Sequence, residues 1–256
     1  MIDYRNAFDF KGKVALVTGA GGSIGREISK GFSICGANVV VADLIEERAI
    51  ETVRELEPVE GGHMAISVDI TNLENINLMA ENVCNKYGKI DFLSNHAGIN
   101  IRKPAVEFLE SDWDDVCNTN LKGNFFVAQA VGKKMIERGY GKIVNTASVS
   151  SKRGHPNLAI YAATKGGVTQ LTKVLANEWA KYGINVNAIG PGYVNTNQTA
   201  NLLEDIEKYN KMISLIPMGR LGEMTDMVGT ILFLCSDVSN YITGQTIYVE
   251  GGRTID

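Results

Sequence analysis

The chain has 256 residues, a formal net charge of −4, 45% hydrophobic residues and 21% charged residues. This length and composition fit one large globular domain, or two small ones, with enough chain to bury a substantial core. The weak negative charge and the absence of a basic run argue against a nucleic-acid-binding protein, and no apolar run reaches the roughly 18 residues of a membrane span.

The first ten residues hold no apolar segment, so we expect no signal peptide. The cysteines lie far apart and form no Cys-x-x-Cys pair; they are Cys35, Cys84, Cys117 and Cys235. Such thiols are typical of a reducing compartment, so we expect a cytoplasmic protein without disulfides. The histidines at 63, 96 and 155 are isolated, so no metal site is predicted.

Short apolar runs alternate with longer stretches of helical spacing. The runs cover 14–17, 39–42, 64–68, 90–93, 142–145, 184–189 and 246–249. This alternation predicts an α/β fold with a parallel sheet between two layers of helices, and ligands in such folds bind beyond the carboxyl ends of the strands. We expect a single domain over 1–256, with a polar stretch at about 192–221 as a substrate lid.

A glycine-rich stretch follows the first predicted strand: residues 18–25 read Thr-Gly-Ala-Gly-Gly-Ser-Ile-Gly. Glycines here allow a sharp turn and a close approach to a pyrophosphate at the N-terminus of the next helix. The Gly-x-Gly-x-x-Gly spacing is absent, because Ile24 occupies a position that needs glycine. We interpret the stretch as a related nucleotide-binding loop; a tight strand–helix turn without a ligand is the alternative.

Asp43 ends the second predicted strand, about 18 residues after Gly25. A carboxylate there accepts hydrogen bonds from ribose hydroxyls and repels a 2′-phosphate, and Leu44 follows where a phosphate site would have Arg or Lys. We therefore expect NAD rather than NADP. The alternative role of Asp43 is to cap the helix that begins near Glu46.

Two more strand ends carry polar or small residues. Asp69, after the third strand, either accepts from the adenine amino group or caps the next helix. Residues 95–98 read Asn-His-Ala-Gly, and the small residues allow a close approach of backbone and cofactor. A plain strand-end turn is the alternative for this second motif.

The chemistry is predicted at Ser148, Tyr161 and Lys165. Ser148 follows the strand at 142–145, and Tyr161 and Lys165 lie four residues apart at the start of a helical pattern, so they share one helix face. The cation should lower the pKa of Tyr161 from about 10, so that the phenol exchanges a proton with a substrate oxygen held by Ser148. Taken alone, the Tyr/Lys spacing is more typical of an ordinary surface pair on a helix, and the other motifs of the chain favour the catalytic interpretation.

Together these motifs resemble the short-chain dehydrogenase/reductase family, in its single-domain branch, over about residues 11–252. The resemblance implies a Rossmann-like, doubly wound three-layer fold with a seven-stranded parallel sheet, and hydride transfer with a nicotinamide cofactor. Two positions depart from the family's pattern. Ser23 replaces the usual middle glycine, and His96 replaces a second Asn, although it can still hydrogen-bond across the strands.

The resemblance also implies roles for individual residues. Asn120, Ser148, Tyr161 and Lys165 would form a catalytic tetrad in which Lys165 also binds the nicotinamide ribose and Asn120 holds a water. Without the family, Asn120 reads as a polar residue inside a helix. The expected cofactor-binding residues are Gly19, Gly22, Ser23, Ile24, Gly25, Asp43, Leu44, Asp69, Ile70, Asn95, Ala97, Gly98, Tyr161, Lys165, Pro191, Gly192, Val194 and Thr196.

The residues expected around the substrate are mostly polar, which favours a sugar acid or polyol over a steroid or long acyl chain. They are Ser148, Ser150, Arg153, His155, Tyr161 and Tyr193. Arg153 or Lys152 could pair with a carboxylate, although exposed loop cations are common. Segments 192–196 and 216–222 resemble the family's sugar-acid and polyol dehydrogenases, and its 3-oxoacyl reductases share much of this pattern.

Two long helical patterns, near 118–138 and 161–181, carry apolar residues on more than one face, which indicates an interface. The family resemblance implies a homotetramer. The leading hypothesis is an NAD-dependent dehydrogenase of a secondary alcohol on a sugar acid or polyol. The alternatives are an NADPH-dependent 3-oxoacyl or general carbonyl reductase, and a nucleotide-binding sensor that has lost catalysis.

Overall fold

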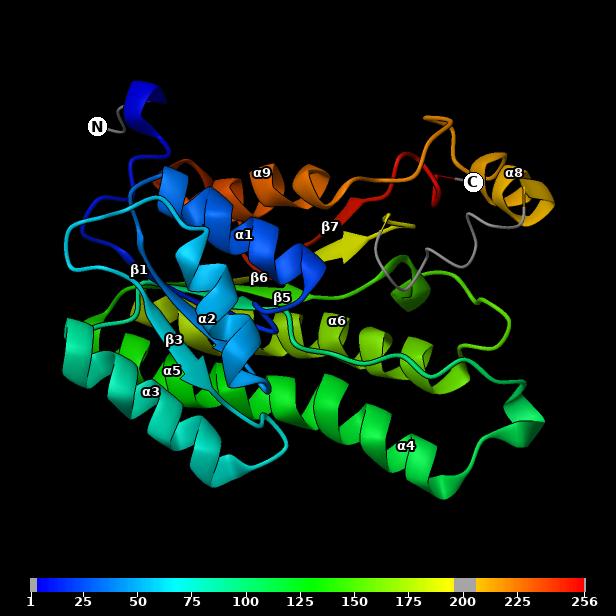
Figure 1. Cartoon of the computed structure of the whole chain (residues 1–256), viewed down its shortest axis with the longest axis horizontal. Helices are drawn as coiled ribbons and strands as arrows, with labels where there is room; N and C mark the ends of the chain where they lie inside the picture. Colours follow the sequence, from blue (N-terminus) through cyan, green and yellow to red (C-terminus); the bar gives the residue numbers. More distant parts are fainter. Residues whose placement is uncertain (1–3, 196–205, 256) are drawn as a thin grey trace.

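A computed structural model of the chain describes residues 4–195 and 206–255, and shows a parallel sheet between two layers of helices (Figure 1). The strands are β1 (Val14–Thr18), β2 (Asn38–Asp43), β3 (Met64–Ser67), β4 (Phe92–Asn95), β5 (Gly141–Thr146), β6 (Ile184–Pro191) and β7 (Thr246–Val249). Their order is β3-β2-β1-β4-β5-β6-β7, with every neighbouring pair parallel. This confirms the predicted doubly wound fold, although β4 begins and ends two residues later than the apolar run at 90–93.

Helices on the two faces pack against different sides of the sheet (Figure 1). One layer contains α1 (Ser23–Ile34), α2 (Glu46–Arg54) and α9 (Met224–Cys235); the other contains α3 (Leu73–Tyr87), α5 (Asn124–Arg138) and α6 (Ala159–Trp179). Two further helices are α4 (Glu110–Cys117) and α8 (Ile206–Ile213). The predicted helix at 118–138 is not one regular helix, because Asn118–Gly123 forms a π-helical turn before α5 begins.

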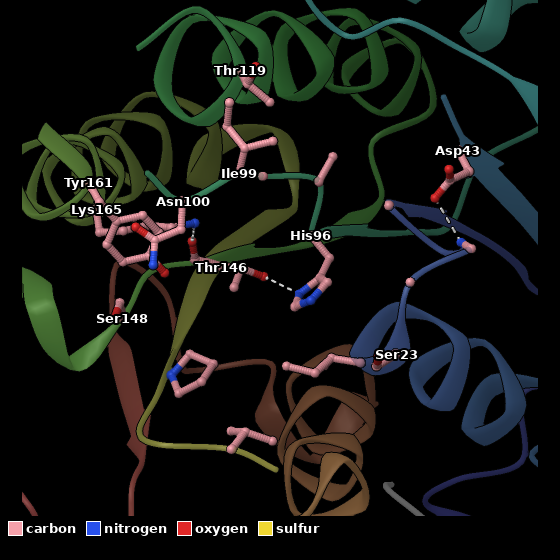
Figure 2. Close-up of a pocket in the computed structure, with 18 of the residues that line it drawn as sticks. Ser23, Asp43, His96, Ile99, Asn100, Thr119, Thr146, Ser148, Tyr161 and Lys165 are labelled. Carbon is pink, nitrogen blue, oxygen red and sulfur yellow. Dashed lines mark hydrogen bonds between the residues drawn. The ribbon is translucent and has the colours of Figure 1, made fainter. Parts of the chain in front are cut away.

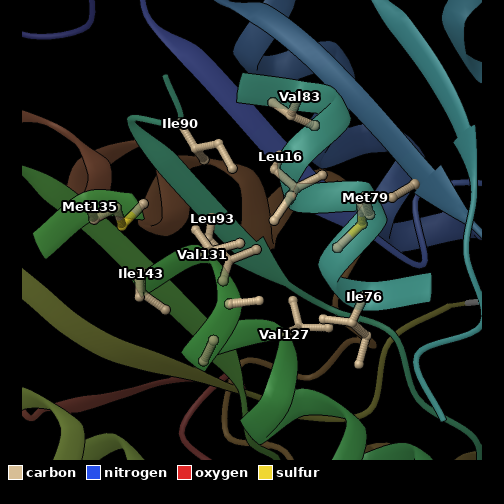
Figure 3. Close-up of a cluster of buried hydrophobic side chains, with 14 of the residues drawn as sticks. Leu16, Ile76, Met79, Val83, Ile90, Leu93, Val127, Val131, Met135 and Ile143 are labelled. Atoms are coloured by element: carbon tan, nitrogen blue, oxygen red, sulfur yellow. The ribbon is translucent and has the colours of Figure 1, made fainter. Parts of the chain in front are cut away.

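The sheet has an apolar core on each face. Alternate side chains of a strand point to opposite faces, so Leu16 of β1 joins one core and Val17 the other. Figure 3 shows the first core, where Leu16 and Leu93 meet Val83 of α3 and Val131 of α5. Burying one such side chain stabilises the fold by about 1.5–3 kcal/mol. The strand ends that carry the polar motifs therefore project from a well-packed layer.

Among the described residues, no helix combines the length and apolarity needed to cross a bilayer, and no three potential metal ligands lie together. The four cysteines are free thiols. Part of the predicted lid at 192–221, including Thr196, lies outside the described residues.

Candidate active site

A cavity of about 1200 Å³ runs along the carboxyl ends of the strands (Figure 2). It is lined by most of the predicted site residues, namely Gly19, Gly22, Ser23, Ile24, Asp43, Leu44, Asp69, Ile70, Ala97, Gly98, Ser148, Ser150, His155, Tyr161, Lys165, Pro191, Gly192, Tyr193 and Val194. Gly25, Asn95 and Asn120 lie behind this wall. Arg153 does not line the cavity either; its Nη1 donates to the backbone oxygen of Arg253 at 2.8 Å.

The glycine-rich loop packs directly on the residues that follow β4. A Cβ on Gly19, whose φ is +64°, would lie 2.9 Å from Cα of Ala97, and a Cβ on Gly25 would lie 2.4 Å from the backbone oxygen of Gly19. The N-cap of α1 is Gly22, which offers no side chain to the first-turn amides. An uncapped helix N-terminus beside a glycine loop suits an anionic group, so these residues fit a dinucleotide pyrophosphate.

Asp43 is buried at the far end of the cavity, where both carboxylate oxygens accept backbone hydrogen bonds. Oδ2 accepts from Gly21 N–H at 2.9 Å and Oδ1 from Ile45 N–H at 3.1 Å. Ile45 is the N-cap of α2, so Asp43 does not cap that helix. Each oxygen keeps a second lone pair, which a ribose hydroxyl can use and a phosphate cannot.

Asp69 likewise does not cap the following helix. Its Oδ1 accepts from the backbone N–H and the hydroxyl of Thr71 at 2.8 and 2.7 Å. The side chain of Asn72 caps α3 instead, because its Oδ1 accepts from the N–H groups of Glu74 and Asn75 at 2.9 and 3.2 Å. Asp69 is therefore held in a turn that lines the cavity.

Ser148, Tyr161 and Lys165 meet at the opposite end of the cavity from Asp43 (Figure 2). Lys165, only 4% exposed, donates from Nζ to the backbone oxygen of Thr146 at 2.8 Å and lies 5.6 Å from the centroid of the Tyr161 ring. The Ser148 side chain lies close enough to the Tyr161 phenol to lower the phenol's pKa, and it accepts from Ser150 N–H at 3.1 Å. This places a hydroxyl, a phenol and an amine around one point of the cavity.

The pKa of Tyr161 is raised, so the expectation that it would be lowered was wrong. Burial favours the neutral phenol by more than the Ser148 hydrogen bond and the charge of Arg102 favour the phenolate. Burial also lowers the pKa of Lys165 to about 8, because the ammonium loses its water. The expectation counted the neighbouring cation and left out the loss of solvent.

Asn120 lies in the π-helical turn and holds the loop after β4. Its Oδ1 accepts from Ile99 N–H and its Nδ2 donates to the backbone oxygen of Ile99, both at 2.8 Å. Its own backbone oxygen accepts from Asn124 Nδ2 at 3.0 Å. The side chain thus fixes the backbone of Ile99, and the expected role of Asn120 in holding a water stays a prediction.

His96, which replaces an Asn usual in the family, links the ends of two neighbouring strands, as predicted. Its Nδ1 lies 2.9 Å from the hydroxyl of Thr146, the last residue of β5 (Figure 2). Burial, and then the charge of Lys165, lower the pKa of His96 to about 4, so the ring is neutral at pH 7.

The cavity wall also contains polar residues that were not predicted from the sequence, among them Arg48, Asn100 and Arg102. The last two lie on the loop after β4, and position after a strand end was the available signal, but the prediction stopped at Gly98. Arg102 affects the pKa values of Tyr161 and His155, and it has no hydrogen bond or ion pair within the described parts of the chain. Among the described residues, Arg102 is therefore a cation without a partner at the end of the cavity that contains Ser148, Tyr161 and Lys165, which we call the reacting end.

Comparison with known proteins identifies the family. A family model described as enoyl-(acyl carrier protein) reductase matches residues 19–254. A curated 2-dehydro-3-deoxy-D-gluconate 5-dehydrogenase from Escherichia coli is 40% identical over 96% of this chain and 97% of its own length. The chain belongs to the short-chain dehydrogenase/reductase family. It is an oxidoreductase of CH–OH groups that uses a nicotinamide cofactor, and the resemblance inferred from its motifs is confirmed.

Other members of the family cover almost the whole chain. A gluconate 5-dehydrogenase from Gluconobacter oxydans is 38% identical over 99% of both chains, and a 3-oxoacyl-(acyl-carrier-protein) reductase from Thermotoga maritima is 41% identical over 96% of this chain and 99% of its own. The crystal structure of a gluconate 5-dehydrogenase from Burkholderia cenocepacia, in complex with NADP and tartrate, superimposes with a TM-score of 0.93 at 37% identity, covering 98% of each chain. This dehydrogenase therefore has relatives with both sugar-acid and acyl activities.

Proposed function

We propose that the protein is an NAD-preferring dehydrogenase that interconverts a secondary alcohol and a ketone on a sugar acid. The observation that carries this is Arg102, which lines the cavity near Tyr161 and has no ion-pair or hydrogen-bond partner in the part of the chain that the structure describes. A substrate carboxylate would form a charge-assisted pair with this guanidinium, which would hold a nearby carbon against Tyr161 and Ser148. The names of the gluconate and 2-dehydro-3-deoxygluconate dehydrogenases among its relatives support this substrate class.

The proposed mechanism assigns each step to a side chain. In the oxidation direction, the Tyr161 phenolate takes the proton of the substrate hydroxyl, and Ser148 donates a hydrogen bond to the same oxygen. Lys165 has three N–H donors, so it can bind ribose hydroxyls with those that Thr146 does not use. Bound NAD supplies the hydride acceptor. Asn120 acts indirectly, by fixing Ile99 and hence the loop that carries Arg102.

The preference for NAD rests on Asp43. A 2′-phosphate would bring negative charge next to its buried carboxylate, whereas a free ribose hydroxyl would donate to it. The Burkholderia relative was solved with NADP, so the point needs a direct test. We expect a lower KM for NAD than for NADP. The opposite result would overturn the preference and direct attention to Arg48, which lines the cavity beside Asp43.

The function is tested by following NADH or NADPH formation with sugar acids, polyols, hydroxyacyl thioesters and hydroxysteroids. Arg102→Leu should lower kcat/KM for a sugar acid by about 10- to 100-fold more than that for an uncharged polyol, because both lose the effect of Arg102 on the Tyr161 pKa and only the sugar acid also loses the carboxylate pair. Arg54→Leu, on the exposed surface of α2, is the matched control. Turnover of the hydroxyacyl thioester alone would favour the second candidate, a 3-oxoacyl reductase running in reverse, which the Thermotoga relative supports.

We further propose a homotetramer that works in the cytoplasm. Leu109 is 61% exposed, Trp113 of α4 is 52% exposed, and Val174 of α6, a helix that α4 contacts, is 44% exposed. Exposed apolar residues on these two helices favour an interface between copies of the chain. The four free thiols favour a reducing compartment.

A further inference from the structure

Two polar atoms in the cavity wall are buried and have no hydrogen-bond partner among the described residues. They are Oδ1 of Asn100 and Nε2 of His155. An unpartnered buried polar atom destabilises a protein unless a ligand supplies the missing bond. The two residues that carry these atoms line the cavity that also contains Ser148 and Tyr161, so a bound substrate is the natural source of their partners.

Asn100 is positioned to accept a hydrogen bond from a substrate group. The preceding residue, Ile99, is fixed through both its N–H and its backbone oxygen by Asn120. The Oδ1 atom of Asn100 can only accept a hydrogen bond, so its partner must carry an O–H or N–H. A carboxylate cannot fill this role, whereas a substrate hydroxyl can.

His155 is equally constrained. Its Nδ1 lies 3.1 Å from the Ser150 hydroxyl, and its ring packs edge-on against Tyr193 with the centroids 5.9 Å apart. Burial, followed by the charges of Arg253, Arg153 and Arg102, lowers the pKa of His155, so the ring is neutral at pH 7. A neutral Nε2 exchanges a hydrogen bond with a hydroxyl, and leaves Arg102 as the group that attracts the carboxylate.

We infer that Asn100 and His155 form a hydroxyl-recognition subsite for substrate carbons that flank the reacting carbon. The inference rests on the proposed function and narrows its substrate class to polyhydroxy acids, with a carboxylate for Arg102 and a separate hydroxyl for each of the two residues. A 3-oxoacyl substrate has no such hydroxyls and would leave both atoms unpartnered. A site built for a hydroxyl rejects analogues that lack it, so the subsite selects against acyl substrates.

The test measures kcat/KM of the wild type and of each variant with every substrate. With saturating NAD, kcat/KM is measured for gluconate and each of its monodeoxy analogues. The wild-type protein should prefer gluconate by about 10- to 100-fold over the analogue that lacks the hydroxyl bound by Asn100. Asn100→Leu should lose the same factor with gluconate and should match the wild type on that analogue.

His155→Phe should show the same behaviour with a different monodeoxy analogue. His155→Gln keeps a polar atom near the position of Nε2 and should retain most activity with gluconate. Asn82→Leu, on the exposed surface of α3, controls for the substitution itself. Thermal unfolding of every variant shows whether the fold is kept.

Each of the following outcomes would overturn the inference that Asn100 and His155 bind substrate hydroxyls. A loss that is uniform across all substrates would mean that Asn100 only shapes the loop, and a raised KM for NAD would mean that the cofactor is its partner. If the wild type oxidises gluconate but no variant shows an analogue-dependent loss, the subsite fails and the proposed function stands. If the wild type oxidises acyl substrates and no sugar acid, both fail together.

Discussion

Loss of solvent decides the charge of the ionisable side chains at the reacting end of the cavity. The pKa of Tyr161 is raised, and those of Lys165 and His96 are lowered, and burial is the largest cause in each case. The positions of these residues were predictable from sequence, because i and i+4 spacing and strand ends are local features. Their pKa values were not, because burial depends on elements far apart in the chain.

The raised pKa of Tyr161 predicts an asymmetric pH profile. The phenol is protonated at neutral pH, so kcat/KM for alcohol oxidation should increase about tenfold per unit as the pH rises from about 6 to 8. Near pH 8 the ammonium of Lys165 begins to deprotonate, which should flatten the rise. Ketone reduction, which needs the protonated phenol, should stay nearly constant over the same range.

Initial rates in both directions, measured at constant ionic strength, give this profile. Tyr161→Phe is the control and should retain cofactor binding while losing most turnover. An oxidation rate that does not change between pH 6 and 8 would contradict the assignment of Tyr161 as the base.

The lowered pKa of His96 predicts acid sensitivity of the fold. The ordinary pKa is about 6.5 and the folded value is about 4, so between these values the unfolded chain binds a proton that the folded protein does not. The folded state is therefore fully favoured above about pH 6.5 and loses stability on acidification. By pH 4.5 the loss should reach about 2–3 kcal/mol.

Urea denaturation at pH 7 and 4.5 measures the effect. His96→Asn, which restores the residue usual in the family, should remove this part of the acid destabilisation because Asn does not titrate. Equal pH dependence in the two proteins would show that His96 is not the group responsible.

Among the helices and strands, the strands were the most predictable elements. Their near-continuous apolar runs reflect burial on both faces, and β7 begins and ends at the predicted residues. The π-helical turn at Asn118–Gly123 could not be predicted in this way, because it depends on contacts with the loop after β4. The contacts of Asn120 with Ile99 also hold the start of the loop that carries Asn100 and Arg102, and their position after a strand end was the only local signal for these two residues.

Helices α5 and α6 approach closely at a glycine, which gives a test of their packing. A Cβ on Gly132 of α5 would lie 2.7 Å from two ring atoms of Trp179. Gly132→Ala should therefore destabilise the protein by about 1–3 kcal/mol, despite the better helix propensity of Ala. Gly229→Ala on the exposed side of α9, where a Cβ meets nothing within 4 Å, should be neutral or stabilise by up to about 1 kcal/mol. Chemical denaturation would measure both, and a smaller cost at Gly132 than at Gly229 would refute the packing argument.

At the scale of the whole molecule, the exposed apolar residues near α4 and on α6 predict how copies of the chain associate. Trp113→Glu should place a charge in the proposed two-fold interface and reduce the mass in solution from that of a tetramer to that of a dimer or monomer. Light scattering after size-exclusion chromatography measures the mass. Ile34→Glu, at an exposed apolar residue of α1, should leave it unchanged. A tetrameric Trp113→Glu protein would place the interface elsewhere.

The two ends of the cavity are attached to one sheet. Asp43 ends β2 and Thr146, which holds Lys165, ends β5, with β1 and β4 hydrogen-bonded between them. The distance between Asp43 and Lys165 is fixed, because the strands cannot slide without breaking their register and both cores, and the proposed cofactor site spans this fixed distance. Nicotinamide mononucleotide would reach Lys165 but would gain nothing at Asp43. In the proposed binding mode, much of the affinity that positions the nicotinamide is supplied at Asp43, three strands away from the carbon that reacts.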